Sequence, residues 1–270
     1  TLDGDQDDEE ERAVRWPSHA DRQELGLFLT PPELALDVAT AALQLFGSDE
    51  IDFGDPALGS GVFFAALLQV VAPQQIRSAT GVEIEEGRAR LTSERWGHRG
   101  LSVVVSDFLD ARPSGQRNFI LANPPYIRYQ MIDAESAARW RAQICRELGV
   151  RLDGRTGLYV YFILFAHQWL AEDGVSAWLV PSEFLSTKYG AVLRDYLTSR
   201  VELLRMHLYD NSASRFENAL VSSIVIIFRK RSPVSATTVR VTVGGMLAKP
   251  SSVADIPLAA LRDSKKWVLN

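Results

Sequence analysis

The chain has few of the residues that build disulfide frameworks or metal centres. It holds one cysteine, Cys145, which excludes an intrachain disulfide framework. Its four histidines, His19, His98, His167 and His207, are far apart and show no zinc-type spacing. The longest apolar run, 158–166, is too short to span a bilayer. The N-terminus is acidic where a signal peptide would be basic and then apolar. We therefore expect a cytoplasmic protein with no metal and no membrane segment.

The chain also lacks a net positive charge, and its charges are unevenly distributed. The formal net charge is −5, and residues 1–11 hold seven acids and no base. Without this segment, which we expect to be disordered, the chain carries a net charge of +2. Between residues 112 and 155 there are eight arginines against four acids. This excess is equally compatible with a solvated helix face and with a surface that contacts phosphate groups.

Short β-branched or apolar runs alternate with stretches of helical periodicity, which is typical of a doubly wound parallel sheet. The expected strands are 51–54, 79–84, 102–106, 119–122, 175–180, 203–208 and 222–229. The expected helices are 32–46, 61–71, 86–96, 157–171 and 188–199, with an inserted helix that carries arginines at 134–147. The predicted fold is thus α/β and Rossmann-like, with a seven-stranded, mostly parallel sheet and helices on both faces. Residues 238–243 could pair with 222–229 as a hairpin or an edge addition.

A glycine-containing turn follows the first expected strand. It reads Asp55-Pro56-Ala57, then Leu58, then Gly59-Ser60-Gly61. Glycines between a strand and a helix allow a tight turn and a close approach of the backbone to a ligand. Alone the turn is a weak signal, because an ordinary loop would look the same. No Lys-Ser or Lys-Thr pair follows the turn, which disfavours a nucleoside triphosphate.

Acidic residues end the first three strands, at Asp55, Glu83 and Asp107. Taken singly, each is more often a solvated or capping carboxylate. Together, beyond the carboxyl ends of successive strands, they indicate a nucleoside site. Glu83, followed by Ile84, is placed to take both hydroxyls of a ribose. Asp107 can accept from an adenine amino group while Phe108 packs on the ring.

The fourth strand leads into Asn123-Pro124-Pro125-Tyr126. Two prolines forbid a helix and fix an extended path. The side-chain carbonyl of Asn123 and a proline carbonyl can then accept both hydrogens of an NH2 group, and they stabilise the charge that develops on its nitrogen. Tyr126 offers a face for stacking. The alternative is a rigid loop with a buried asparagine. The loop by itself indicates an amino or amide nitrogen held towards an electrophile.

The order of these motifs resembles that of the N6-adenine DNA methyltransferases of restriction–modification systems, the group typified by TaqI. Phe28-Leu29-Thr30-Pro31-Pro32 matches the Thr-Pro motif that precedes the glycine loop in that group. Residues 177–185 resemble its sixth motif and residues 216–228 its eighth. The resemblance covers approximately residues 25 to 229.

The resemblance implies a class I methyltransferase that uses S-adenosylmethionine to methylate the amino group of an adenine flipped out of double-stranded DNA. The implied cofactor contacts are Thr30, Pro31, Asp55, Pro56, Ala57, Gly59, Gly61, Glu83, Ile84, Asp107, Phe108 and Asn123. The implied catalytic residues are Asn123, Pro124, Pro125, Tyr126 and Phe216. Within these sets, Asp55 would meet the methionine amine, and Phe216 would complete an aromatic clamp with Tyr126. Phe216 could instead be a core residue at a strand entrance.

Two features depart from the group. Leu58 stands where a small residue is more common, and we expect it to crowd the loop slightly. Residues 230–270 are too few for the target-recognition domain of the relatives. We therefore expect an acidic, flexible segment at 1–24, a catalytic domain at 25–231, and at 232–270 an extension or the start of a missing domain. A separate target-recognition domain or subunit would then be a partner, and the chain would be a fragment.

Two other classes remain open. Glutamine or ribosomal-RNA methyltransferases use the same loop, although their extra domain typically precedes the glycine turn and they lack a counterpart of the Phe216 segment. A non-catalytic methyltransferase-like subunit is the second, against which stands the joint retention of Asp55, Glu83, Asn123 and Tyr126. The loop does not distinguish adenine from cytosine as the target.

Overall fold

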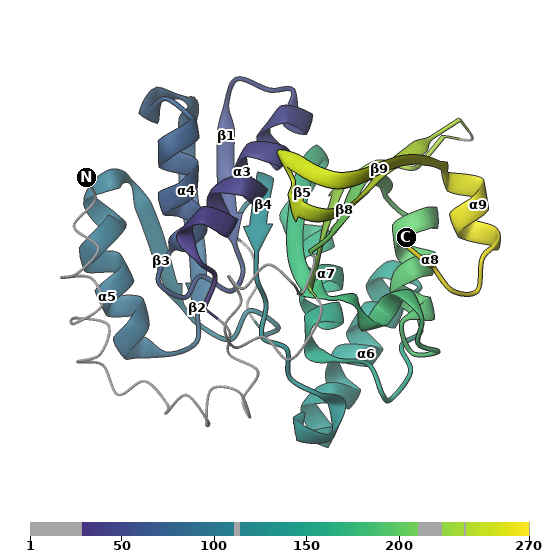
Figure 1. The fold of residues 1–270 in the computed structure, drawn as a ribbon. Coiled ribbons are helices and arrows are strands. Elements are labelled where there is room, and N and C mark those ends of the chain that lie inside the picture. Colours follow the sequence, from purple (N-terminus) through teal and green to yellow (C-terminus); the bar gives the residue numbers. More distant parts are fainter. Residues whose placement is uncertain (1–28, 111–113, 210–222, 235, 270) are drawn as a thin grey trace.

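The structure, a computed structural model, describes residues 29–110, 114–209, 223–234 and 236–269 (Figure 1). The acidic segment at 1–24 and Phe216 lie outside these residues, so both remain sequence-based expectations.

A single mixed sheet runs through the molecule, with the strand order β3-β2-β1-β4-β5-β7-β6-β8-β9. The strands are β1 Ile51–Asp55, β2 Ile76–Glu83, β3 Leu101–Val105, β4 Arg117–Ala122, β5 Leu170–Pro181, β6 Glu202–Leu208, β7 Ser223–Arg229, β8 Thr238–Met246 and β9 Lys249–Pro257. Strands β1 to β5 are parallel, and β7 is antiparallel to both β5 and β6. This is the predicted α/β class with each of the seven predicted strands.

Helices cover both faces of the sheet (Figure 1). The α-helices are α3 Pro32–Phe46, α4 Val62–Val70, α5 Glu86–Trp96, α6 Ala134–Leu148, α7 Leu158–Trp169, α8 Ala191–Ser199 and α9 Leu258–Asp263. Short 3-10 turns are η1 Pro73–Gln75, η2 Gly97–Arg99, η3 Tyr129–Met131 and η4 Ser182–Leu185. The six predicted helices are therefore confirmed, most of them within a few residues at each end.

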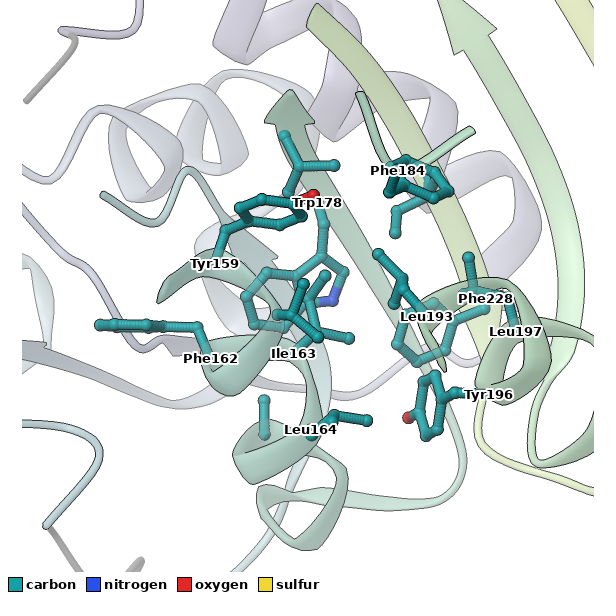
Figure 2. Packing of buried hydrophobic residues seen from close by; sticks show 14 of the residues in the cluster. Tyr159, Phe162, Ile163, Leu164, Trp178, Phe184, Leu193, Tyr196, Leu197 and Phe228 are labelled. Carbon is teal, nitrogen blue, oxygen red and sulfur yellow. The ribbon is translucent and has the colours of Figure 1, made fainter. Parts of the chain in front are cut away.

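Alternation along the central strands produces two hydrophobic cores. Phe119 and Leu121 of β4 pack with α3 and α4, whereas Ile120 and Ala122 pack with α7. Because successive side chains of a strand point to opposite faces, strands covered on both faces read as continuous apolar runs. Helix α7 is buried on nearly all sides because it lies between the sheet and α6. Figure 2 shows Trp178 of β5 among side chains of this helix.

The sheet has two strands more than predicted. Of the two arrangements expected for 222–229 and 238–243, the hairpin is wrong, whereas β8 does belong to an addition at the edge of the sheet. Strand β7 is already paired with β5 on one side and β6 on the other, so it has no open edge. Strand β8 pairs instead with β6, in parallel, and β9 returns antiparallel to β8. Residues beyond 231 thus add two strands to the sheet of the preceding residues, and α9 follows these strands in the chain.

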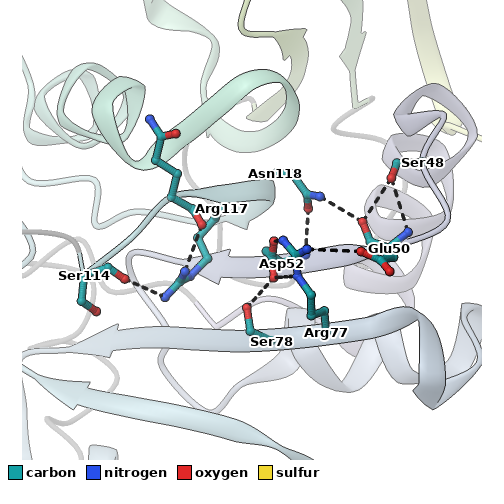
Figure 3. A network of polar contacts seen from close by, with 9 residues as sticks. Ser48, Glu50, Asp52, Arg77, Ser78, Ser114, Arg117 and Asn118 are labelled. Carbon is teal, nitrogen blue, oxygen red and sulfur yellow. Dashed lines mark hydrogen bonds and ion pairs between the residues drawn. The ribbon is translucent and has the colours of Figure 1, made fainter.

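Polar residues fasten the amino ends of the central strands (Figure 3). Asp52 of β1 accepts hydrogen bonds from Arg77 Nε at 3.0 Å and from Ser78 Oγ at 2.7 Å, and its own amide donates to Asn118 Oδ1 at 2.8 Å. The hydrogen bonds from Arg77 lower the pKa of the Asp52 carboxyl. These contacts align β1, β2 and β4 at the edge opposite their carboxyl ends.

The chain that the structure describes contains no helix long and apolar enough to cross a membrane. The same residues include no group of three or more His, Cys, Asp or Glu side chains placed to hold a metal ion.

A buried carboxylate joins α3 to the turn between β8 and β9. Asp37 is 7% exposed, and its Oδ2 accepts from the Leu247 amide at 2.6 Å while its Oδ1 accepts from the Ala248 amide at 3.1 Å. The hydroxyl of Tyr209 donates to the same carboxylate at 3.3 Å. The Asp37 side chain therefore holds the β8–β9 hairpin against α3.

Replacing this carboxylate should loosen the hairpin. In Asp37→Ala the buried Leu247 amide loses its acceptor, so the free energy of unfolding should fall by about 2–4 kcal/mol in urea titrations. The exposed Asp49 supplies the matched control, and Asp49→Ala should change stability by less than about 0.5 kcal/mol. Equal small effects in the two variants would contradict the anchoring role.

Candidate functional site

A pocket of about 240 Å³ opens beyond the carboxyl ends of β1, β2, β3 and β4. Ten of the residues predicted from the sequence line it: Pro56, Ala57, Gly59, Glu83, Ile84, Asp107, Phe108, Asn123, Pro124 and Pro125. Motifs separated by about seventy residues therefore converge on one cavity. Thr30, Pro31, Asp55, Gly61 and Tyr126 are not part of the wall, although each lies near it by its place in the chain or by its contacts.

The glycine turn is held from the neighbouring helix. Gly61 has a φ of 80°, and a Cβ there would come within 2.8 Å of the Trp96 ring of α5. The indole of Trp96 donates to the Ser60 carbonyl at 3.1 Å, and the Thr92 hydroxyl donates to the Gly59 carbonyl at 2.8 Å. Gly61 thus serves the turn and the approach of α5, not the pocket wall.

Leu58 is accommodated by a glycine on the next strand. Its side chain is 2% exposed and lies over Gly81 of β2, where a Cβ would come within 2.4 Å of Leu58 Cδ1. The crowding expected from Leu58 is relieved because position 81 has no side chain.

Asp55 is more deeply placed than predicted. It is 1% exposed, and its Oδ1 accepts from the Ala57 amide at 3.0 Å. Burial raises the pKa of its carboxyl to about 7; the Ala57 amide lowers the pKa and the nearby Glu83 raises it. The structure therefore places Asp55 behind the turn, and its contact with a methionine amine remains a prediction.

Glu83 sits at the joint between the glycine turn, β2 and α5. Its Oε2 accepts from the Gly59 amide at 3.0 Å, while its Oε1 accepts from the Glu85 amide at 2.9 Å and from Arg88 at 3.1 Å. Each carboxylate oxygen has two lone pairs. Both pairs of Oε1 are engaged, so one acceptor position remains on Oε2. Glu83 can take one ribose hydroxyl in this arrangement, and a second only if Arg88 moves.

No sequence motif points to Arg88, which reaches the pocket only through the first turn of α5. Its side chain is 15% exposed and lies along the wall. It supplies the wall with a cation bound to Glu83.

The third strand contributes Asp107 and Phe108. Asp107 Oδ1 accepts from the Leu109 amide at 2.9 Å, and burial raises the pKa of its carboxyl above the ordinary value. The ring of Phe108 stacks on Phe162 of α7, with ring centroids 5.5 Å apart. The position of Phe108 is therefore set by a helix that follows it by some fifty residues.

A hydrophobic wall from α6 and α7 has no counterpart among the sequence motifs. Trp140, Leu158 and Phe162 line the pocket together with Ile127. The Trp140 indole donates to Asp110 Oδ1 at 3.1 Å, which orients the ring. These residues have ordinary core spacing on their helices, so only the packing of α6 and α7 against the strand ends identifies them.

The amide of Asn123 is oriented by the Thr-Pro segment. Its Nδ2 donates to Thr30 Oγ1 at 2.9 Å. In this arrangement the amide nitrogen faces Thr30, and Oδ1 is the acceptor end of the side chain. Pro31 then begins α3 as its N-cap. Two motifs that are 93 residues apart in the chain thereby form one unit.

Tyr126 is anchored from its hydroxyl end. Its OH donates to the Leu179 carbonyl of β5 at 3.2 Å, and burial raises the pKa of this phenol above its ordinary value. The backbone carbonyl of Ile127 accepts from the Leu158 amide at 3.1 Å, which ties the loop to α7. The half-buried ring of Tyr126 is therefore fixed at its tip.

The arginine excess at 112–155 is partly engaged within the fold. Arg117 is buried and donates to Thr80 Oγ1 at 2.8 Å. Arg139 pairs with Asp110 at 3.2 Å, and Arg155 with Asp153 at 3.0 Å. At these positions the charge is already matched or buried, which leaves less of it for phosphate groups.

The raised pKa of Asp55 predicts a pH-dependent stability. In the folded protein this carboxyl keeps its proton up to about pH 7, whereas in the unfolded chain it ionises near pH 4, so folding binds a proton between these values. Its contribution is present at low pH and decreases as pH rises towards 7. Asp55→Asn, which cannot ionise, should therefore gain stability over the wild type as pH rises from about 5 to about 8. Urea unfolding at both pH values measures this, and a constant difference would contradict it.

The fit of Leu58 over Gly81 predicts non-additive substitutions. Gly81→Ala should lower the free energy of unfolding by about 1–3 kcal/mol through overpacking. In the double variant Leu58→Ala/Gly81→Ala, the added methyl enters the space vacated by Leu58. The decrease should then fall short of the sum of the two single decreases by about 1 kcal/mol. Strict additivity across the four proteins would show that the two side chains do not compete for space.

Comparisons with known proteins show similarity to methyltransferases in both sequence and fold. Residues 93–216 match the Eco57I restriction-modification methylase family. The Type II methyltransferase M.AccI of Acinetobacter calcoaceticus is 26% identical over 208 residues, which cover 76% of this chain and 37% of that protein. The structure of the type IIG restriction endonuclease BpuSI superposes with a TM-score of 0.74 at 19% identity, covering 91% of this chain and 33% of that chain.

The fold has a further parallel in a Listeria monocytogenes protein described as a class I S-adenosylmethionine-dependent methyltransferase. It superposes with a TM-score of 0.65 at 17% identity, covering 83% of this chain and 68% of that chain. The chain spans about two fifths of the length of the first curated relatives it matches. In sequence the chain resembles restriction–modification DNA methyltransferases, and its fold is that of class I S-adenosylmethionine-dependent methyltransferases.

Proposed function

We propose that this protein transfers a methyl group from S-adenosylmethionine to the exocyclic amino group of an adenine in double-stranded DNA. The observation that carries this proposal is the arrangement of Asn123, whose Nδ2 donates to Thr30 Oγ1 and whose amide oxygen is an acceptor on the same loop as Pro124 and Pro125 of the pocket wall. An amino group needs two acceptors if both of its hydrogens are to be held.

The residues of the pocket fit a nucleoside cofactor. Glu83 has one acceptor position for a ribose hydroxyl, and Asp107 and Phe108 of the same wall offer a carboxylate and a ring to an adenine. The wall contains no lysine, and its arginine is bound to Glu83, so a polyphosphate finds no cradle among these described residues. When bound, S-adenosylmethionine supplies an electrophilic methyl group on its sulfonium sulfur.

The loop would act on the substrate in a single transfer. The target base leaves the stack of the duplex, and Tyr126 offers it a ring whose tip is fixed by Leu179. Asn123 Oδ1 and the Pro124 carbonyl accept the amino hydrogens and direct the nitrogen lone pair towards the methyl carbon. The new N–C bond would form as the S–C bond of the bound cofactor breaks, and the nitrogen would then release one proton to solvent.

Substitutions of Asn123 and Glu83 should affect methyl transfer and cofactor binding differently. Asn123→Ala should lower kcat for transfer of labelled methyl groups to genomic DNA by at least about a hundredfold, because the variant has one acceptor fewer for the developing charge. Its affinity for S-adenosylmethionine, measured by calorimetry, should remain close to that of the wild type. Glu83→Ala should show the reverse order, with cofactor binding impaired first.

Nucleoside analysis of the labelled DNA then identifies the base. Label in N6-methyladenine supports the proposal, whereas label in N4-methylcytosine would show that the target base is cytosine and not adenine. Transfer to RNA or protein and not to DNA would overturn it. If the full-length protein binds the cofactor but transfers no methyl group to any duplex, the protein is a non-catalytic methyltransferase-like subunit. Unchanged turnover in Asn123→Ala would show that Asn123 does not take part in methyl transfer.

A further inference from the structure

A second pocket, of about 470 Å³, lies between the segment that joins η4 to α8 and the segment that follows α9. Three of the five lysines in the whole chain line it, namely Lys188, Lys265 and Lys266. Two arginines, Arg194 and Arg262, line it as well. Segments about seventy positions apart in the chain thus bring most of the lysine charge to one place.

A buried guanidinium holds the two walls together. Arg194 is 7% exposed and donates to the Thr187 carbonyl at 3.1 Å, to the Lys265 carbonyl at 2.7 Å and to the Phe184 carbonyl. The Trp267 amide donates to the Leu185 carbonyl at 2.8 Å, and the Trp267 ring is buried. The backbone around the lysines is therefore fixed, while their side chains are exposed.

The charge of the pocket is only partly balanced. Arg194 and Arg262 donate to backbone carbonyls, which are neutral. Within the part of the chain that the structure describes, none of the three lysines forms an ion pair with a carboxylate. Asp195 and Asp263 also line the pocket, which leaves five basic residues against two acidic ones. A buried cation without a partner ion is costly, and an anion in the pocket would offset that cost.

Strand β5 connects the anchor of the Asn-Pro-Pro-Tyr loop with the segment that lines the pocket. Strand β5, whose Leu179 carbonyl anchors Tyr126, ends at Pro181 and passes directly into η4. Glu183 of η4 accepts from the Tyr189 hydroxyl at 3.0 Å, and Tyr189 follows Lys188 in the chain. Burial raises the pKa of the Tyr189 phenol, Glu183 raises it further, and the charge of Arg128, just beyond the loop, lowers it. Tyr189, which follows Lys188 of the pocket, is therefore close enough to Arg128 to be affected by its charge.

We propose that the Lys188–Lys265–Lys266 pocket binds backbone phosphates of duplex DNA beside the target base. This inference rests on the proposed function. Contacts to phosphates position a duplex without reading its sequence, so the pocket would set the placement of the DNA and leave base recognition to other surfaces. Exposed lysines on a fixed backbone suit this role, because an ammonium group binds a phosphate as a point charge.

The test measures binding of a fluorescent DNA duplex to the full-length protein over a range of salt concentrations. The variant is the triple substitution Lys188→Gln/Lys265→Gln/Lys266→Gln, and Lys249→Gln on the exposed strand β9 is the matched control. The slope of log K against log salt concentration should become shallower by about one for each phosphate that the variant no longer binds, and so by up to about three in the triple variant. The control should keep the wild-type slope.

The outcomes separate this proposal from the proposed function. A wild-type slope in the triple variant, in a protein that methylates DNA, overturns the phosphate site and leaves the methyltransferase intact. A shallower slope in the triple variant, with no methyl transfer by the wild type, supports the site and overturns the function. A wild type that binds no duplex overturns both. Cofactor affinity, which the lysines should not affect, confirms that the triple variant is folded.

Discussion

The arrangement of the pocket depends on the hydrogen bonds that the Glu83 carboxylate accepts. This carboxylate receives the Gly59 amide from the turn after β1, the Glu85 amide from the start of α5 and the guanidinium of Arg88. A charge that is 5% exposed is tolerated because these donors replace water. The same contacts close the turn against β2 and bring Arg88 to the wall. A single side chain thus sets both the shape of the cavity and its remaining acceptor position.

The substrate side of the site depends on a longer-range contact. Asn123 and Thr30 meet because β4 is adjacent to β1 while α3 packs across the same face of the sheet. A proline-containing loop positions the backbone of Asn123, and the hydroxyl of Thr30 accepts a hydrogen bond from its amide nitrogen. Tyr126 obtains its fixed position in the same way, from a carbonyl of β5. The geometry that an amino group requires is therefore distributed over three elements.

Much of this was predictable because it is local. The strands, helices and turns are each indicated within about ten residues, and motifs at the ends of parallel strands must share an edge of the sheet. What could not be predicted depends on pairing and packing. The partner of β8 is decided by which strand edge is still open, and the Trp140 and Phe162 wall is decided by how α6 and α7 cross the strand ends. The depth of Asp55 likewise depends on the turn that covers it. Arg88 and the lysine pocket carry no motif, so only the folded arrangement identifies them.

Helix α3 connects two regions that are otherwise distant. Its N-terminal side adjoins Thr30, which orients Asn123, and its second turn carries Asp37, which holds the turn between β8 and β9. The β8–β9 hairpin and the Asn123 amide are therefore both attached to the N-terminal part of one helix, although they lie more than 120 positions apart in the chain.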